Sequence, residues 1–418
     1  MWEVVNSPAP SCGDMGTPYP EATLEAPIVD RMLGRVIQKT RPEVVHIQEL
    51  AGLPSSVLEV LRHADVPSLM TLQDYLLLCP TLKLLDHKGD VCLRREVGDI
   101  CPHCCLQAPQ DAAFLVRATA HYEVNRLKDL VPPAVRSLLK RARTAVAVQQ
   151  ISIARPPRKP LLELPRGEYQ RRREVNVARL HAPGLLVAQS YRVAEIYRTL
   201  GVQEEQLRTI HLTLKHLEYI QPRNVEISGP VQFGTLNGCI SLQKGARLIV
   251  DALRILESLG LSGRFHLHVW GGLLEEIRLE LLSNPNVTYY GWYKVYSLDR
   301  MLEAVDVGLI PSTWEEAFGF VGLEFLAKGV PIIGNARGGI RDYTIDGVTG
   351  WVNRTNDAAG LARLMAAIIA NPDSVAALSR SIRARRGEFI KTMRAHGEEI
   401  ENLYRSLSGR SQRNRPLN

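Results

Sequence analysis

The stretch that decides the fold runs from Pro311 to Gly339 and reads PSTWEEAFGFVGLEFLAKGVPIIGNARGG. It begins where the apolar run VDVGLI ends, and from Val231 onward such short apolar runs alternate with amphipathic helical segments. This alternation predicts a parallel sheet with helices on both faces. Sheets of this kind bind ligands at the carboxyl ends of their strands, so the stretch stands where a ligand site is expected.

Apolar periodicity predicts the elements around this stretch. In the second half of the chain the expected strands are VQFGTL, FHLHVW, NVTYYGW, VDVGLIPS and GVPIIGN, with a further short strand after Gly350. Helices are expected over 244–259, 321–328 and 357–370, and a polar helix is expected to run to about Leu407. In the first half the expected strands are 43–47, 67–72 and 184–189, with a helix over 55–63. Both halves therefore read as α/β.

The length of the chain sets the expected number of domains. Its 418 residues exceed the usual size of one domain, and a proline-containing linker at 219–229 marks the expected boundary. We therefore expect an N-terminal domain over 1–222, a C-terminal domain over 223–390, and a final helix with a frayed tail over 391–418. No apolar run approaches the roughly 18 residues of a membrane span, and the first residues lack the pattern of a signal peptide. A cytoplasmic location is expected.

Basic residues give the chain a formal net charge of +7, which favours contact with phosphate groups on a nucleotide, a nucleic acid or an anionic lipid. Many of them crowd into the segment from Arg155 to Arg173, where the three prolines of RPPRKP favour a loop. Two interpretations stay open for this segment. It is either a solvated loop without a specific partner or a surface for peripheral contact with a membrane.

Two glutamates in the stretch from Pro311 to Gly339 are spaced as two contacts to one ligand would be. Glu316 and Glu324 are eight residues apart, or about 12 Å at helical rise, which fits a folded nucleotide sugar. Ionised carboxylates are strong acceptors, so one can bind sugar hydroxyls and the other the ribose. Between them, a glycine turn leads into a short helix whose first amides can receive diphosphate oxygens. The alternative is a pair of surface glutamates without a ligand.

These residues closely resemble the signature of the family 4 retaining glycosyltransferases of bacterial type, a pair of glutamates with seven residues between, followed by GVPVI. The resemblance implies the GT-B architecture of two facing Rossmann-like domains. It also implies that Glu316 contacts the donor sugar, that Glu324 holds the ribose, and that Lys244, in a KG dipeptide, neutralises the leaving diphosphate. In the first half, RPEVVHIQEL, PSLMTLQDYLLLCP and AQSYRVAEIYRTLGV, with Ser190, resemble further family segments.

The resemblance assigns a set of site residues. Those expected in catalysis are Glu316, Lys244, Asp74 and Gln73, and those expected to bind the donor are Gly234, Thr235, Lys244, Gly271, Glu316, Phe318, Gly319, Phe320, Val321 and Glu324. Three departures stand beside it. Gln73 takes the place of a family histidine and cannot titrate, Thr235 takes the place of a frequent arginine, and the opening βα units of the first domain are missing or reduced.

The function that the resemblance implies is a retaining transfer from a nucleotide-diphosphate sugar that needs no catalytic metal. The acceptor is not identified and is expected among bacterial glycans or small molecules. A non-catalytic glycosyltransferase-like subunit that acts on a partner is an alternative, as is a nucleotide-sugar epimerase or a phosphorylase of the same fold. A homodimer or a complex with a partner glycosyltransferase is also left open.

Five of the seven cysteines fall within 27 positions: Cys79, Cys92, Cys101, Cys104 and Cys105. Such clustering in a cytoplasmic chain points to metal more than to disulfides. Cys101 and Cys104 have the spacing of a zinc knuckle, and Cys79 and Cys92 can complete a closed four-thiolate site in an insertion over 79–105. Reduced thiols in the core of a loop are the alternative. Without interleaved aromatic residues, no nucleic-acid partner is expected.

Overall fold

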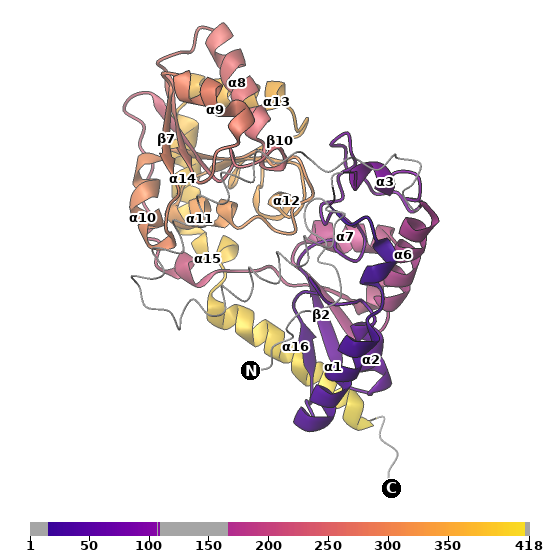
Figure 1. The fold of residues 1–418 in the computed structure, drawn as a ribbon. Helices are drawn as coiled ribbons and strands as arrows, with labels where there is room; N and C mark the ends of the chain where they lie inside the picture. Colours follow the sequence, from indigo (N-terminus) through magenta and orange to yellow (C-terminus); the bar gives the residue numbers. More distant parts are fainter. Residues whose placement is uncertain (1–15, 107, 109–165, 414–418) are drawn as a thin grey trace, which may run out of the picture. The chain divides into compact units, whose positions relative to one another are not determined.

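The structure, a computed structural model, describes residues 16–106, 108 and 166–413 (Figure 1). The chain divides into two compact units. The first unit comprises Met1–Arg41, Leu50–Asp65 and Tyr75–Ala182, and the second comprises Pro42–Glu49, Val66–Asp74 and Pro183–Asn418. Both sheets of the described residues belong to the second unit.

The larger sheet has six parallel strands in the order β10-β9-β8-β5-β6-β7. These strands are β5 (Val231–Leu236), β6 (Phe265–Trp270), β7 (Val287–Gly291), β8 (Val307–Ile310), β9 (Ile332–Asn335) and β10 (Gly350–Asn353). Every residue of β8 and β9 is buried, as the continuous apolar runs in the sequence predict for strands covered on both faces. The strand order reverses between β5 and β8. Such a reversal opens a crevice at the carboxyl ends of these two strands.

Helices cover both faces of this larger sheet. Figure 1 shows α8 (Ala246–Ser258), α9 (Glu275–Ser283) and α13 (Ala358–Ala370) gathered on one side of the sheet and α10 (Leu298–Met301) and α11 (Val321–Lys328) on the other. The buried positions of α8 recur at three- and four-residue intervals, which turns one apolar stripe towards the strands. Together these elements form one continuous apolar core around the sheet.

The smaller sheet has four parallel strands in sequential order: β1 (Val45–Ile47), β2 (Ser68–Leu72), β3 (Leu185–Ala188) and β4 (Leu207–Thr209). The last helix, α16 (Met393–Arg413), returns to this sheet, and its Leu407 packs against Leu69, Leu185 and Val187. Tyr404 extends the contact, because its hydroxyl lies 2.7 Å from the Nδ1 atom of His46. A sheet formed early in the chain is therefore completed by the end of the chain.

The remaining elements connect and extend these layers. The other α-helices are α1 (Pro27–Thr40), α2 (Val57–His63), α3 (Cys101–Cys104), α6 (Arg166–Arg179), α7 (Tyr191–Thr199), α12 (Ile340–Tyr343), α14 (Asp373–Ala384) and α15 (Arg386–Phe389). The 3-10 helices are η1 (Pro20–Thr23), η4 (Glu204–Gln206), η5 (Lys215–Glu218), η6 (Leu242–Lys244), η7 (Val295–Ser297) and η8 (Leu302–Ala304). The single polar helix predicted near the end of the chain is wrong, because α14, α15 and α16 are separate helices.

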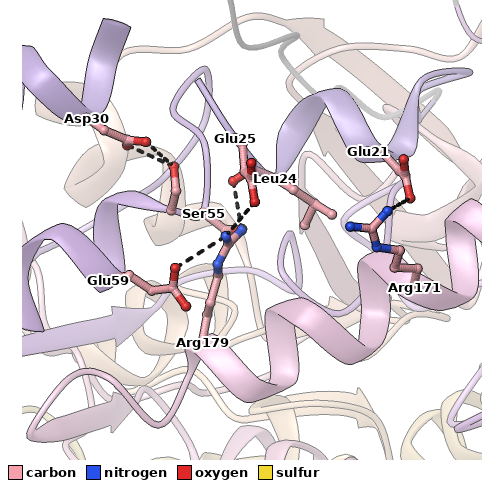
Figure 2. A network of polar contacts seen from close by, with 9 residues as sticks. Glu21, Leu24, Glu25, Asp30, Ser55, Glu59, Arg171 and Arg179 are labelled. Atoms are coloured by element: carbon pink, nitrogen blue, oxygen red, sulfur yellow. Dashed lines mark hydrogen bonds and ion pairs between the residues drawn. The ribbon is translucent and has the colours of Figure 1, made fainter. Parts of the chain in front are cut away.

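A helix with buried arginines, α6, holds the first unit together. Arg179 donates to the Leu24 carbonyl at 2.7 Å and to the Ser55 hydroxyl at 2.9 Å, in the network that Figure 2 shows. Two carboxylates also lie 3.4 Å from the same guanidinium. Because these partners come from separate segments, one cation satisfies acceptors that would be costly to bury alone.

This helix corrects the loop prediction for the last part of the basic segment, residues 166–173. Residues 109–165 lie outside the described part, but Arg172 and Arg173 belong to α6 and are only 2% and 5% exposed. Arg172 donates to the Leu76 carbonyl at 2.6 Å. These arginines are therefore buried structural donors, and neither a solvated loop nor a membrane surface describes them.

No single helix in the described ranges is both long enough and apolar enough to cross a membrane. The bent pair α13 and α14 passes that test together, with an angle of 97° between its helices.

Candidate functional site

A cavity of about 500 Å³ opens at the carboxyl ends of β5 and β8, where the strand order reverses. Residues that follow these two strands form much of its wall. The lining consists of Gln73, Gln189, Leu236, Asn237, Gly238, Ile240, Lys244, Trp292, Leu309, Ile310, Pro311, Ser312, Trp314, Glu316, Ala317, Phe318, Gly319, Phe320 and Val321. All of these residues belong to the second unit. The stretch from Pro311 to Gly339 therefore supplies one side of this cavity.

The central contact of the cavity is an ion pair between Lys244 and Glu316, whose Nζ and Oε1 atoms are 2.8 Å apart. Glycine makes this approach possible. Gly245 has a φ of 96°, and a Cβ atom there would lie 2.3 Å from the carbonyl oxygen of Pro311. The KG dipeptide therefore lets the start of α8 sit directly against the loop after β8. Trp314 adds a ring whose centroid lies 5.7 Å from the Lys244 ammonium.

Glu316 is buried, and its two carboxylate oxygens have different surroundings. Oε1 accepts hydrogen bonds from the Ser312 hydroxyl and the Lys244 ammonium. Oε2 lies on the side of Gly319, 3.1 Å from the position that a Cβ atom would take there. Among the described residues, no hydrogen bond reaches Oε2, which leaves it available to a hydroxyl donor.

The glycine turn that leads into α11 is shaped by Tyr343, a residue that the sequence analysis missed. Gly319 has a φ of 81°, and its carbonyl accepts a hydrogen bond of 2.6 Å from the Tyr343 hydroxyl. A Cβ atom on Gly322 would lie 2.1 Å from the Tyr343 ring, so only glycine fits. No side chain caps α11. Its first amides therefore have no side-chain acceptor, although those of Gly322 and Leu323 donate to the backbone carbonyls of Gly319 and Phe320 at 3.3 Å and 2.9 Å.

Glu324 lies one turn further along α11 and is 6% exposed. Its Oε1 atom lies 2.8 Å from Nε2 of His216, in η5. Its Oε2 atom is buried without a hydrogen-bond partner in the described part of the chain. A buried acceptor in this state is costly unless a donor reaches it. Glu324 does not line the cavity itself.

A second buried ion pair holds the loop after β8. Glu315 accepts two hydrogen bonds from the Arg192 guanidinium, at 3.0 Å and 2.8 Å, and one of 2.7 Å from the Gly338 amide. Burial alone would raise the pKa of the Glu315 carboxyl, but the Arg192 guanidinium outweighs burial and holds the pKa below its usual range. The sequence carries no sign of this pair, because its residues are 123 positions apart.

The structure brings together some of the predicted site residues. Those that line the cavity are Gln73, Lys244, Glu316, Phe318, Gly319, Phe320 and Val321, and those that do not are Asp74, Gly234, Thr235, Gly271 and Glu324. Thr235 is fully buried and donates to the Leu309 carbonyl at 3.2 Å. A Cβ atom on Gly234 would lie 2.6 Å from the Val305 side chain. These two positions therefore face the core, while Gly271 packs on Asn237, with only 2.0 Å left for a Cβ atom.

The zinc site expected at Cys79, Cys92, Cys101 and Cys104 stays a prediction. In residues 16–106, 108 and 166–413, no group of three or more His, Cys, Asp or Glu is arranged to hold a metal ion. Cys101 and Cys105 instead pack in an apolar cluster with Tyr169. Burial, with smaller effects from neighbouring cysteines, raises the pKa of the Cys104 thiol to about 12.

Part of the chain is similar in sequence to known proteins. Residues 237–385 match the family described as "Glycosyl transferases group 1". A D-inositol 3-phosphate glycosyltransferase from Geodermatophilus obscurus is 38% identical over 149 residues, which are 33% of this chain and 32% of that protein. An uncharacterised 41.2 kDa protein of the cps region in Klebsiella pneumoniae is 25% identical over 189 residues, 43% of this chain and 50% of that protein. The chain thus covers 32% and 50% of the length of these two relatives.

Solved structures share the fold over most of the chain. HepE from Anabaena, in complex with UDP, has 14% identity and a TM-score of 0.55, over 89% of this chain and 82% of that one. A sucrose-phosphate synthase from Thermosynechococcus elongatus has 18% identity and a TM-score of 0.56, over 93% and 78%. The predicted α/β fold with two parallel sheets is therefore confirmed. The chain shares the fold of these two proteins, and its residues 237–385 match the group 1 glycosyl transferase family.

Proposed function

We propose that this chain transfers a sugar from a nucleoside-diphosphate donor to an acceptor, with retention of configuration at the sugar and without a catalytic metal. The observation that carries the proposal is the Lys244–Glu316 ion pair in the wall of the cavity at the strand reversal. A cation, a carboxylate with one free oxygen and the uncapped start of α11 stand together there. This set complements a sugar linked to a diphosphate.

The chemistry needs little from the protein beyond charge and position. The bond between the sugar C1 and the diphosphate oxygen breaks, and the acceptor oxygen bonds to C1 on the same face. The departing phosphate oxygen takes the proton of the acceptor, so the products are a glycoside and a nucleoside diphosphate. Lys244 and the α11 amides stabilise the charge that develops on the leaving group, as preorganised donors do in many enzymes.

The two glutamates and Gln73 then have separate tasks. Oε2 of Glu316 accepts a hydrogen bond from a sugar hydroxyl. Glu324 does not line the cavity, but its Oε2 atom, buried without a partner in the described residues, is proposed to accept one from the ribose when the donor binds. Gln73, whose amide donates to the Gln48 side chain at 3.1 Å, borders the cavity and can hydrogen-bond the sugar but cannot transfer its proton. Residues 1–222 are proposed as the acceptor side and 223–390 as the donor side.

A nucleotide screen tests the proposal. UDP comes first, because HepE, which has the same fold, was solved with UDP and with UDP-glucose; GDP and ADP follow. A bound nucleotide at about 100 times its Kd stabilises by about 2.7 kcal/mol, which a thermal melt detects. If none of the three raises the Tm at millimolar concentration, the donor site is not functional.

Turnover of the donor is then measured with variants. Lys244→Ala is expected to lower kcat by about 10²–10³-fold, the loss typical of one preorganised donor. Glu398→Ala serves as the matched control, because it breaks an exposed ion pair, with Arg394, away from the cavity. Equal kcat values for Lys244→Ala and the control would contradict the proposed role of Lys244.

One observation favours a second candidate function, a non-catalytic subunit that activates a partner. Gln73 stands where the resembling family carries a histidine. This candidate predicts nucleotide binding without donor consumption until a partner is added. Turnover by the purified chain excludes it.

A further inference from the structure

Three neighbouring strands of the larger sheet end in a row of buried polar side chains. Asn335 ends β9, Asn353 ends β10, and Ser312 stands two residues after β8. The two asparagines are directly opposite each other in the parallel register. All three side chains are at most 2% exposed. The great majority of polar groups buried this deeply are hydrogen-bonded, because an unsatisfied one is costly.

Hydrogen bonds run along this row from Asn353 through Asn335 to Ser312, and the last of them reaches Glu316. The Asn353 amide donates to the Asn335 Oδ1 atom at 2.9 Å, and the Asn335 amide donates to the Ser312 carbonyl at 3.1 Å. The Ser312 hydroxyl then donates to Oε1 of Glu316. The far end of the row is fixed as well, because the Asn353 amide also donates to the Asp357 carbonyl at 3.0 Å.

We propose that Asn335 and Asn353 are positioning residues for Glu316, an inference that rests on the proposed function. Neither asparagine lines the cavity, so neither is placed to touch a donor. Their effect passes through Ser312, whose hydroxyl occupies Oε1 together with the Lys244 ammonium. With Oε1 occupied on two sides, the carboxylate is held before any ligand arrives.

The consequence is a preorganised acceptor for the sugar. Oε2 of Glu316 faces Gly319, where a Cβ atom would lie only 3.1 Å away. A rotation of the carboxylate would move Oε2 from this position and would break both bonds at Oε1. An error of about 1 Å in such a site can cost about 100-fold in rate. The row therefore acts on the rate of transfer and leaves the nucleotide contacts in place.

The test compares Asn335→Ala with Ser379→Ala in the full chain. Ser379 is fully buried in α14, and its hydroxyl accepts from the Val225 amide at 3.0 Å, so its loss matches the burial without touching the cavity. Asn335→Ala is expected to lower kcat for UDP-glucose, or for the donor that the nucleotide screen identifies, by about 10–100-fold. The Kd for UDP is expected to stay within about twofold. Both variants are expected to lose thermal stability, but only Asn335→Ala is expected to lose turnover.

A crystal structure of Asn335→Ala decides the matter independently of activity. The expected result is a Glu316 carboxylate displaced from Ser312 and Lys244. If the carboxylate keeps both bonds, or if kcat falls no more than in Ser379→Ala, the positioning role is wrong. A wild-type chain that binds UDP but turns over no donor overturns the proposed function instead, and the two failures are thus separate.

Discussion

Neutralising one buried carboxylate tests how the loop after β8 is held. Glu315 is 1% exposed and accepts a two-pronged contact from Arg192. Because its pKa is held below the usual range, the carboxyl is ionised at neutral pH. In Glu315→Gln, an amide of the same shape replaces the carboxylate. The guanidinium of Arg192 then loses its charged partner and faces a group that carries its own N–H donors.

The expected cost follows from the burial of the pair. Removing one partner of a buried ion pair costs about 3–5 kcal/mol, because the other charge is left uncompensated. The Arg192 side chain is 15% exposed and also contacts Glu195 at 3.0 Å, so the lower end of this range applies. With a shift of roughly 2–4 °C per kcal/mol for a unit of this size, Tm should fall by about 6–12 °C.

Urea denaturation of a double-mutant cycle measures this energy. Glu315→Gln, Arg192→Met and the double variant are compared, and the double variant is expected to lose clearly less than the sum of the single losses. The pair also predicts a dependence on pH. The depressed pKa of Glu315 means that its stabilisation is present above the ordinary carboxyl pKa and is lost as the pH falls through the folded-state pKa. A loss below about 1 kcal/mol in Glu315→Gln, or additive single losses, would refute this reasoning.

Two further predictions concern stability elsewhere in the second unit. Burial, with a smaller effect of His266, lowers the pKa of His268 to about 4, so the folded state binds fewer protons than the unfolded state below pH ~6.5. About 3 kcal/mol of the free energy of unfolding is therefore lost as the pH falls from ~6.5 to ~4. His268→Gln should weaken this dependence on pH when the free energy of unfolding is measured with urea at several pH values. An equal dependence on pH in the variant and the wild type would contradict the assignment. Leu407→Ala should lower the free energy of unfolding by about 2–5 kcal/mol, because it removes a buried side chain from the core of the smaller sheet. Leu279→Ala, at a side chain that is 86% exposed, should leave it unchanged. Equal urea midpoints for the two variants would contradict this prediction.

The second half of the chain was predictable because its strands and helices have unambiguous periods. The predicted strand VQFGTL and the predicted helix over 321–328 coincide with β5 and α11. The helix α6 was missed because most of its buried side chains are arginines, which leave no apolar stripe in the sequence. Periodicity reports burial only when the buried residues are apolar.

The candidate site also contains both residues that the sequence predicted and residues that it did not predict. Lys244 and Glu316 were predicted from residues that resemble a known family, and the structure places both in one cavity. The Arg192–Glu315 pair has no counterpart in any local pattern, since tertiary structure alone brings it together. A weak signal existed for Asn335, because a polar residue ends the apolar run GVPIIGN. Its role becomes visible only when the neighbouring strands are placed beside it.

Because α16 packs against the smaller sheet, the core of this sheet is completed only after the end of the chain has been synthesised. Leu69 and Leu185 are made early, but their cover, Leu407, follows Leu185 by 407 − 185 = 222 residues. At about 5–20 residues per second, a ribosome needs on the order of 10–40 s to bridge that interval. For that time the nascent sheet presents an uncovered apolar surface, which makes it a natural client for chaperones that bind emerging chains.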